Sequence, residues 1–416
     1  MRKNNWAGNY RYRASKVHSP ISLEQVQEIV SRAPELRVLG SGHSFTAIVD
    51  AKELLSLERM PTELSIDRAA GTVSFGAQLS YGELAQALED EGMALANLAS
   101  LPQICVAGAV ATATHGSGDG NGNLATSVAA LELVTSDGEV RSASRDDEDF
   151  NGLVVSLGAL GVVTRLTLDI EPGYEVRQRA FDGLAWDTLL AHFEEITSSG
   201  YSVSVFTLWD EAPGGVWVKT IVNGAPESLG DDLFGAVAAR AQQHMIAGVD
   251  PDNCTPQLDS PGPWSQRLPH FRMAFTPSSG EEIQSEYHVP RRHAVAALEA
   301  VRARARIIRP LLLVSEIRTV AGDDLWLSPQ YHQDTVAIHF TWRREQTAVE
   351  RALVEVEAAL APFEPRPHWG KLFLADAQTL APRYPRLDDF IALLARSDGR
   401  SAFTNAWLRT HLLGGG

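Results

Sequence analysis

Val38-Leu39-Gly40-Ser41-Gly42-His43-Ser44-Phe45 is the stretch on which our interpretation of the chain depends. It overlaps a short apolar run, Leu36 to Leu39, which predicts a strand that ends in a turn. Gly40 and Gly42 can take positive φ and let the backbone approach a ligand closely. Successive amides in such a turn can hold an anion. The stretch therefore predicts a ligand-binding turn. The alternative is an ordinary Gly-Ser turn with a surface histidine.

Composition limits the classes of partner. The chain has 416 residues, 44% hydrophobic and 21% charged, which suits a globular protein with more than one domain. Its formal net charge of −16 argues against nucleic acid, because phosphate binding needs clustered Lys and Arg, and against an anionic membrane surface. We find no signal peptide and no apolar stretch that could span a membrane. Only two cysteines occur, Cys105 and Cys254, so we expect a cytoplasmic protein.

A second unusual segment runs from Asn97 to Gly122 and is rich in glycine and alanine. Side chains this small would let a large planar ligand lie against the backbone. A flexible linker is the alternative, but Ile104, Val106 and Val110 argue for a packed segment. Motifs of other chemistries are incomplete. The dinucleotide-binding motif Gly-x-Gly-x-x-Gly begins at Gly116 and Gly118 but has Asn121 in place of its last glycine. We find no P-loop, hydrolase elbow or zinc motif. We therefore predict no metal site.

Polar residues interrupt apolar strands in the second half of the chain. Residues two apart on a strand share one face, and this spacing relates Glu316 to Arg318, His339 to Thr341, and Gln284 to Glu286. Lys371 lies alone in a further predicted strand, Trp369 to Leu374. Each pair alone is typical of a solvent-facing strand edge. Several pairs together favour a shared site, because buried charges persist only when they are paired.

These segments resemble the vanillyl-alcohol oxidase superfamily of FAD-linked oxidases. The His43 turn resembles the flavin-attachment motif, and Ser100-Leu-Pro102 through Thr114-His-Gly-Ser-Gly118 resembles the second flavin-binding segment. The resemblance continues through Glu316-Ile-Arg318 and His368-Trp-Gly-Lys371 to Phe403-Thr-Asn405. It covers nearly the whole chain and is greatest to bacterial alditol oxidases.

The resemblance implies an α+β fold of two domains. The FAD-binding domain would comprise residues 1–172, completed by residues 383–416. A substrate-binding cap domain with a large antiparallel sheet would comprise residues 173–382, the first boundary falling at Glu171-Pro-Gly173. The resemblance also implies FAD covalently attached through His43. The expected flavin contacts are Leu39, Gly40, Ser41, Gly42, His43, Ser44, Ser100, Cys105, Gly108, Thr112, Ala113, Thr114, His115, Val163 and Asn405.

The implied reaction is oxidation of the terminal alcohol of an acyclic polyol, such as xylitol or sorbitol, with dioxygen reduced to hydrogen peroxide. Positions matching the family's substrate site are Ser100, Glu316, Arg318, Thr341 and Lys371, with Gln284 and His339 as neighbours. Arg318 and Lys371 would stabilise the alkoxide, and His339 would accept a proton. An aldonolactone oxidase or dehydrogenase is the alternative, and a different electron acceptor stays open. We expect a monomer.

Relatives commonly carry other residues at a few of these positions. Cys105 stands where serine is common, Ala113 stands where glycine is common, and Arg400-Ser-Ala-Phe403 replaces a common Gly-Lys-Phe. None of these residues belongs to the expected catalytic set. Each departure could weaken flavin binding.

Overall fold

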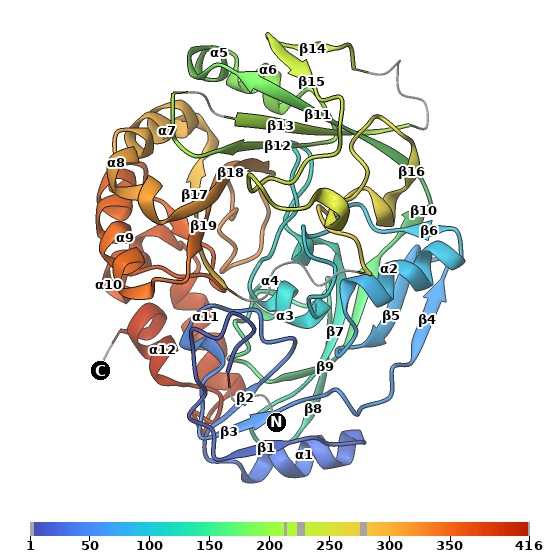
Figure 1. Ribbon diagram of the computed structural model, residues 1–416. Helices are drawn as coiled ribbons and strands as arrows, with labels where there is room; N and C mark the ends of the chain where they lie inside the picture. The colour runs from blue at the N-terminus through green and yellow to red at the C-terminus, as the bar shows by residue number, and fades with distance from the viewer. Residues whose placement is uncertain (1–3, 212–213, 223–228, 275–280, 415–416) are drawn as a thin grey trace.

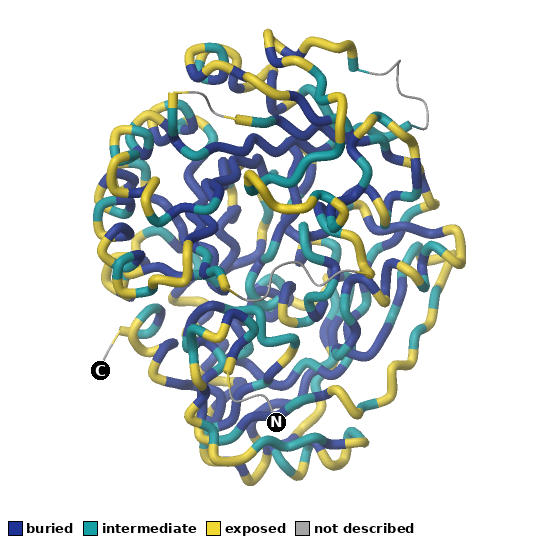
Figure 2. Tube along the Cα trace, viewed as in Figure 1, coloured by how far each residue is buried: buried dark blue, intermediate teal, exposed yellow. Residues whose placement is uncertain are grey.

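The computed structural model describes residues 4–211, 214–222, 229–274 and 281–414. Strands within these ranges form four sheets, and the largest is antiparallel (Figure 1). Buried residues fill the spaces between sheets and helices, while exposed residues follow the outer turns and helix faces (Figure 2). Helices and sheets are mixed, as expected for an α+β fold.

The predicted turn of residues 38–45 follows the edge strand of a small parallel sheet. This sheet has the order β1-β3-β2, and helix α1 connects β1 to β2. Ser22-Leu-Glu-Gln25 resembles a capping box and predicts a helix, and Ser22 does cap α1, whose Val26 and Val30 are buried. The bounds are β1 Lys16–His18, α1 Leu23–Arg32, β2 Leu36–Val38 and β3 Glu53–Leu55.

A five-stranded sheet of order β4-β5-β9-β7-β8 forms the second layer of the first part of the chain. The sequence predicts hairpins of residues 64–67 with 72–75 and of residues 128–135 with 139–141, and both are confirmed in this sheet. Ser80 and Glu83 also predict a capping box, which opens α2. The bounds are β4 Leu64–Asp67, β5 Thr72–Gly76, α2 Tyr81–Asp90, β6 Met93–Ala94, α3 Val106–Ala111, β7 Val128–Val134, β8 Val140–Ser144, α4 Phe150–Val154, β9 Val162–Asp169 and β10 Glu171–Pro172.

The large sheet begins after the predicted boundary. Its ten strands follow the order β14-β15-β11-β13-β12-β18-β19-β17-β20, with β16 paired to β11. Its strands are β11 Glu175–Leu184, β12 Ser202–Thr207, β13 Gly214–Ile221, β14 Asp232–Leu233, β15 Ala236–Ala238, β16 Gly262–Pro263, β17 Glu282–Pro290, β18 Leu312–Val320, β19 Thr335–Arg343 and β20 Arg366–Pro367. Its connecting helices are α5 Trp186–Ala191, α6 Phe193–Thr197, α7 Ala294–Arg302, α8 Ala305–Ile308, α9 Gln346–Leu360 and α10 Ala377–Leu380.

The last part of the described chain returns to the first. Helices α11, Leu387–Ser397, and α12, Ala406–Leu408, lie near the blue N-terminal strands in Figure 1. The Leu36 amide donates to the Ala402 carbonyl at 2.7 Å, and the buried Arg37 guanidinium donates to the Phe403 carbonyl at 2.8 Å. On this basis we propose that residues 383–416 complete a domain of residues 1–172, with residues 173–382 as the second domain.

Two predictions of local structure are wrong. The predicted strand from Trp369 to Leu374 is a turn and coil, in which the Lys371 amide donates to the His368 carbonyl at 3.0 Å. Trp369, Leu372 and Phe373 are buried, and although the Leu372 amide donates to the Gln284 carbonyl of β17 at 2.8 Å, the segment forms no strand. The sequence also predicts a helix from Pro290 to Ile308, but this helix starts later, because Pro290 ends β17 and α7 begins at Ala294.

Asn405 provides a test of how the chain's end is anchored. Its amide donates to the carbonyls of Ala47, Ile48 and Asp50 at 2.9 to 3.2 Å, and its side-chain oxygen caps α12 at the Leu408 amide. Asn405→Ala would leave these buried groups unpaired, so we expect a loss of about 2 to 4 kcal/mol in unfolding free energy. Denaturant titration measures this loss. Thr410→Ala, an exposed change on the following turn, is the control, and equal stability of both variants would contradict the anchoring role.

Candidate active site

A cavity of about 1190 Å³ lies between the His43 turn, the glycine-rich segment and the polar face of the large sheet. Sites for small ligands usually occupy about 300 to 1,000 Å³, so there is room for a large cofactor and a small substrate together. Lining residues come from parts of the chain that are far apart in the sequence. They include Arg37, residues of the segment from Ser100 to Gly118, which we call the second flavin-like segment, and the turn at Lys371.

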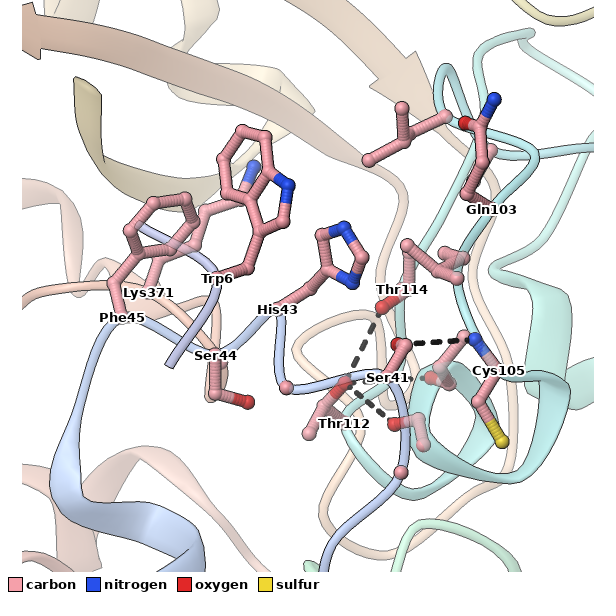
Figure 3. A pocket seen from close by; sticks show the side chains of 18 of the residues that line it. Trp6, Ser41, His43, Ser44, Phe45, Gln103, Cys105, Thr112, Thr114 and Lys371 are labelled. Atoms are coloured by element: carbon pink, nitrogen blue, oxygen red, sulfur yellow. Dashed lines mark hydrogen bonds between the residues drawn. The ribbon is translucent and has the colours of Figure 1, made fainter. Parts of the chain in front are cut away.

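The His43 turn forms one wall. Gly42 has φ of +74°, as predicted, whereas Gly40 does not adopt positive φ, and a Cβ there would lie in ordinary contact with Cys105, at 3.4 Å. Within the described chain, the backbone amides of Gly40, Gly42 and Ser44 donate no hydrogen bond to the protein. Trp6 stacks on His43 with ring centroids 5.1 Å apart, and Figure 3 shows the imidazole between Trp6 and the opposite wall.

The second flavin-like segment forms the opposite wall (Figure 3). The Cys105 amide donates to the Ser41 hydroxyl at 3.2 Å, so the two walls are joined directly. The Cys105 thiol points to the Ala77 carbonyl at 3.1 Å, and burial raises the thiol's pKa, which keeps it protonated. Beside it, the hydroxyls of Thr112 and Thr114 lie 3.2 Å apart.

Most of the predicted flavin residues line this cavity. Ala113 and Asn405 do not: Ala113 is fully buried with φ of +52°, and Asn405 is held by backbone carbonyls. The left-handed backbone explains why glycine suits position 113. The predicted flavin residues that line the cavity are Leu39, Gly40, Ser41, Gly42, His43, Ser44, Ser100, Cys105, Gly108, Thr112, Thr114, His115 and Val163.

All seven predicted catalytic and substrate-binding residues line the same cavity: Ser100, Gln284, Glu316, Arg318, His339, Thr341 and Lys371. The register of three central strands explains how they meet. Glu316 on β18 lies opposite His339 on β19, and His339 lies opposite Glu286 on β17, so the three form one row across the sheet. These positions are buried, with Glu316 6% exposed. The alternative of a solvent-facing strand edge is therefore wrong.

Glu286 is the centre of the charged cluster, although the sequence pattern gave it no role beyond its pairing with Gln284. Its fully buried carboxylate lies 2.6 Å from Lys371 Nζ, 3.0 Å from an Arg318 Nη and 3.2 Å from His115 Nε2. Burial would raise its pKa, but these three neighbours hold the pKa well below its ordinary value. Its position two residues after Gln284, on the same face of the strand, was the signal that could have identified it.

The second carboxylate, Glu316, is held separately. Its Oε1 lies 2.7 Å from His270 Nε2, and Arg318 Nε lies 3.6 Å from Oε2. Burial would raise the pKa of Glu316, but Arg318 and His270 hold it well below its ordinary value. Sequence reasoning missed His270, because it lies in the long segment between β13 and β17 and belongs to no pattern.

His339 is neutral and oriented by its neighbours. Burial, followed by the charge on Lys371, lowers its pKa to about 3. Gln284 donates from its amide to the Glu282 carboxylate at 2.8 Å and turns its oxygen to His339 Nε2 at 3.2 Å. A carboxylate only accepts, so His339 Nε2 is the donor nitrogen. Within the described chain its Nδ1 has no partner and carries the lone pair.

Three buried groups, His115, Glu286 and His288, bring possible ligand atoms within 4.8 Å of one another. Their chemistry does not suit a divalent ion. Lys371 and Arg318 already neutralise the carboxylate, and the Gln330 amide donates to His288 Nδ1 at 2.7 Å. Two neighbouring cations would repel a third.

Comparison with known proteins agrees with this geometry. Residues 14–144 match the FAD binding domain family, and residues 276–411 match the D-arabinono-1,4-lactone oxidase family. The chain is 47% identical to an alditol oxidase from Streptomyces sp. over 99% of both chains, and 28% identical to an L-gulono-1,4-lactone dehydrogenase from Mycobacterium tuberculosis over 97% of both. The fold also matches cholesterol oxidase from B. sterolicum, with a TM-score of 0.79, 16% identity and coverage of 98% of this chain and 96% of that one.

The fold and the FAD-binding match define a flavin-dependent oxidoreductase with the vanillyl-alcohol oxidase type of fold, which confirms the predicted fold class. Within that class, the chain belongs to the alditol oxidase family. Among the described residues, no helix is both long and apolar enough to cross a bilayer.

Cys105 offers a test of the second wall. Its thiol already has a protein acceptor in the Ala77 carbonyl, and serine would make the same bond with a stronger donor. We therefore expect Cys105→Ser to bind as much FAD as the wild type, measured as bound flavin per chain. Cys254→Ser, at a buried cysteine that does not line the cavity, is the control. Loss of flavin from Cys105→Ser alone would show that the wall is packed around sulfur.

Proposed function

We propose that the protein oxidises the terminal primary alcohol of an acyclic polyol, such as xylitol or sorbitol, to the aldose and reduces dioxygen to hydrogen peroxide. The observation that carries the proposal is the charged row of Glu316, His339 and Glu286, with Arg318 and Lys371, in the cavity that His43 also lines. Many donors and acceptors in one buried site suit a substrate with a hydroxyl on every carbon, and an apolar alcohol would leave them unpaired.

The cavity fits a flavin bound at the His43 turn. The amides of Gly40, Gly42 and Ser44, which donate to no described protein atom, would hold pyrophosphate oxygens. FAD, when bound, supplies the hydride acceptor and the reaction with dioxygen. We propose that it is attached covalently through His43, whose ring is fixed by stacking on Trp6. The small residue Gly108, with open space where a Cβ would lie, leaves room for a planar ring.

Two cations would stabilise the reacting oxygen. Lys371 and Arg318 both contact Glu286, which fixes them in place with their charges balanced before substrate binds. An alcohol oxygen beside them would gain stabilisation as it becomes negative, because the donors are already oriented in a site with little water. Glu286 is therefore proposed as the residue that orients both donors.

The remaining groups would bind the polyol and take its proton. The Oε2 of Glu316 lies too far from Arg318 Nε for a hydrogen bond, so this oxygen can accept the hydroxyl next to the reacting one. The lone pair on His339 Nδ1 would accept the proton of the reacting alcohol. Ser100, Thr341 and Gln284 would bind hydroxyls further along the carbon chain of the polyol.

A lactone substrate is the second candidate, because residues 276–411 match the D-arabinono-1,4-lactone oxidase family. A lactone ring presents fewer hydroxyls to the same charged row. Peroxide production with xylitol, sorbitol and a sugar lactone, followed by product analysis, separates the candidates. We also propose a cytoplasmic monomer, in keeping with two buried free cysteines.

The covalent bond to His43 can be tested directly. We expect flavin absorbance to remain with the acid-precipitated wild-type chain, and the peptide containing His43 to carry the flavin mass. His43→Ala should release all of its flavin on acid treatment. His192→Ala, which changes a surface histidine outside the cavity, is the control. Release of flavin from acid-treated, fully loaded wild type would refute the bond.

Lys371 is the test of the alkoxide site. Lys371→Met keeps most of the side-chain volume and removes the charge, so we expect anaerobic reduction of the flavin by xylitol to slow by roughly 10² to 10³-fold. Reoxidation by dioxygen should change less, because the alcohol takes no part in it. Lys52→Met, at an exposed lysine outside the cavity, controls for loss of a positive charge. Near-normal reduction in Lys371→Met would leave Lys371 as an ion-pair partner of Glu286 only.

A further inference from the structure

A lysine lies buried in the large sheet behind the proposed substrate site. Lys219 on β13 is 1% exposed, and in the described chain its ammonium forms no direct ion pair with a carboxylate. Instead it contacts the Leu268 carbonyl, the Pro269 carbonyl at 3.4 Å and His270 Nδ1 at 3.1 Å. Burying a lysine is costly unless its protons are all bonded, so this arrangement needs a reason.

The contact with His270 determines which imidazole nitrogen carries the hydrogen. An ammonium has three donors and no acceptor, so His270 Nδ1 must accept from Lys219. The hydrogen of the neutral ring then belongs to Nε2, which donates to Glu316 Oε1 at 2.7 Å. Burial and the charge on Lys219 lower the pKa of His270 to about 4, which keeps the ring neutral. The Glu316 carboxylate, which only accepts, also requires hydrogen on Nε2, so Lys219 and Glu316 together hold a neutral His270 ring with its donor toward Glu316.

Packing encloses the Lys219 end of this chain of bonds, whereas His270 and Glu316 line the cavity. Phe206 and Trp217 pack against the His270 ring, with centroids 5.7 and 5.3 Å away. Glu316 from β18 is the charge that favours the ammonium, whereas burial and Arg318 oppose it, and the pKa of Lys219 falls to about 7. The remaining titratable neighbour of Lys219 is the buried thiol of Cys254, which lies with His270 in the segment between β13 and β17.

We infer that Lys219 is a positioning residue: through His270 it fixes the Glu316 carboxylate so that Oε2 faces the hydroxyl next to the reacting carbon of the polyol. This inference rests on the proposed function. Lys219 touches neither substrate nor flavin. It acts on the substrate through His270, whose Nε2 hydrogen binds Oε1 of Glu316. The Oε2 atom is then left to bind the substrate.

Lys219 also holds the loop at residues 268–270, so a purely structural role is the competing explanation. Gln178 provides a matched control. It lies directly opposite Lys219 in the β11–β13 pairing and is fully buried. Its amide holds the same segment between β13 and β17 by bonds to the carbonyls of Thr255 and Pro256. It has no bond to His270 or Glu316. Gln178→Met therefore removes a comparable loop anchor without touching the His270 tautomer.

The kinetic test compares Lys219→Met, Gln178→Met and wild type with xylitol and with 2,4-dideoxypentitol, which lacks the hydroxyl next to either terminal carbon. We expect Lys219→Met to raise KM for xylitol about tenfold with kcat within about twofold, because a uniform binding contact is lost. KM for the 2,4-dideoxypentitol should not change, and Gln178→Met should match wild type with both. Equal effects on both substrates, or a normal KM for xylitol, would overturn the inference.

A double-mutant comparison with His270→Gln gives a second route. Glutamine can donate to Glu316 without a tautomer to be fixed, so Lys219→Met should add little to KM in that background. Full additivity of the two changes would overturn the inference.

The tautomer itself can be measured without turnover. In protein labelled with ¹⁵N-histidine, the His270 signals, assigned with His270→Gln, should show a neutral ring with hydrogen on Nε2 in wild type. In Lys219→Met the ring should take up a second hydrogen, on Nδ1, at a higher pH than in wild type, because the neighbouring charge that lowers its pKa is gone. Unchanged signals would overturn the inference even if polyol turnover is normal. Absence of polyol turnover in wild type with the expected tautomers would instead refute the proposed function and remove the substrate role of Glu316.

Discussion

The buried Glu286 carboxylate is the interaction on which the arrangement of the site depends. An isolated charge at such a position would be prohibitively costly, and it is stable only because Lys371 and Arg318 lie against it. The three residues come from β17, β18 and the turn after β20, which are far apart in the sequence. Each cation is therefore positioned by the same carboxylate. Removing that carboxylate would leave two buried cations facing each other.

This constraint explains why the central strands carry polar residues on a face that is closed to solvent. The register of β18, β19 and β17 aligns the charged residues in one row, so a shift of one residue would turn the row away from the cavity. The facing walls use small residues instead. Gly40 and Cys105 pack closely, and the Cys105 amide bonds to Ser41. One side of the cavity thus provides fixed charge, and the other provides backbone amides and space.

Much of the local structure could be predicted from the sequence, because caps, turns and alternation are local signals. The hairpins, the helix capped by Ser80 and the polar pairs on β17, β18 and β19 are confirmed. The site residues that line the cavity were reached largely through the family resemblance. Lys371 was placed on a strand because its apolar neighbours suggested one, whereas they lie in a turn and coil that shares only single backbone bonds with β17. His270 and Lys219 could not be predicted, because they meet only when the segment between β13 and β17 packs against β13.

The bonds between the two ends of the chain have a consequence for biosynthesis. Arg37, at the start of the His43 turn, needs the carbonyl of Phe403, and Leu36 needs that of Ala402. A ribosome makes Phe403 366 residues after Arg37, so this part of the bonding of the N-terminal strands stays unmade during most of the synthesis between them. The cavity wall at Arg37 is therefore fixed fully only after the segment at residues 402–403 has been made.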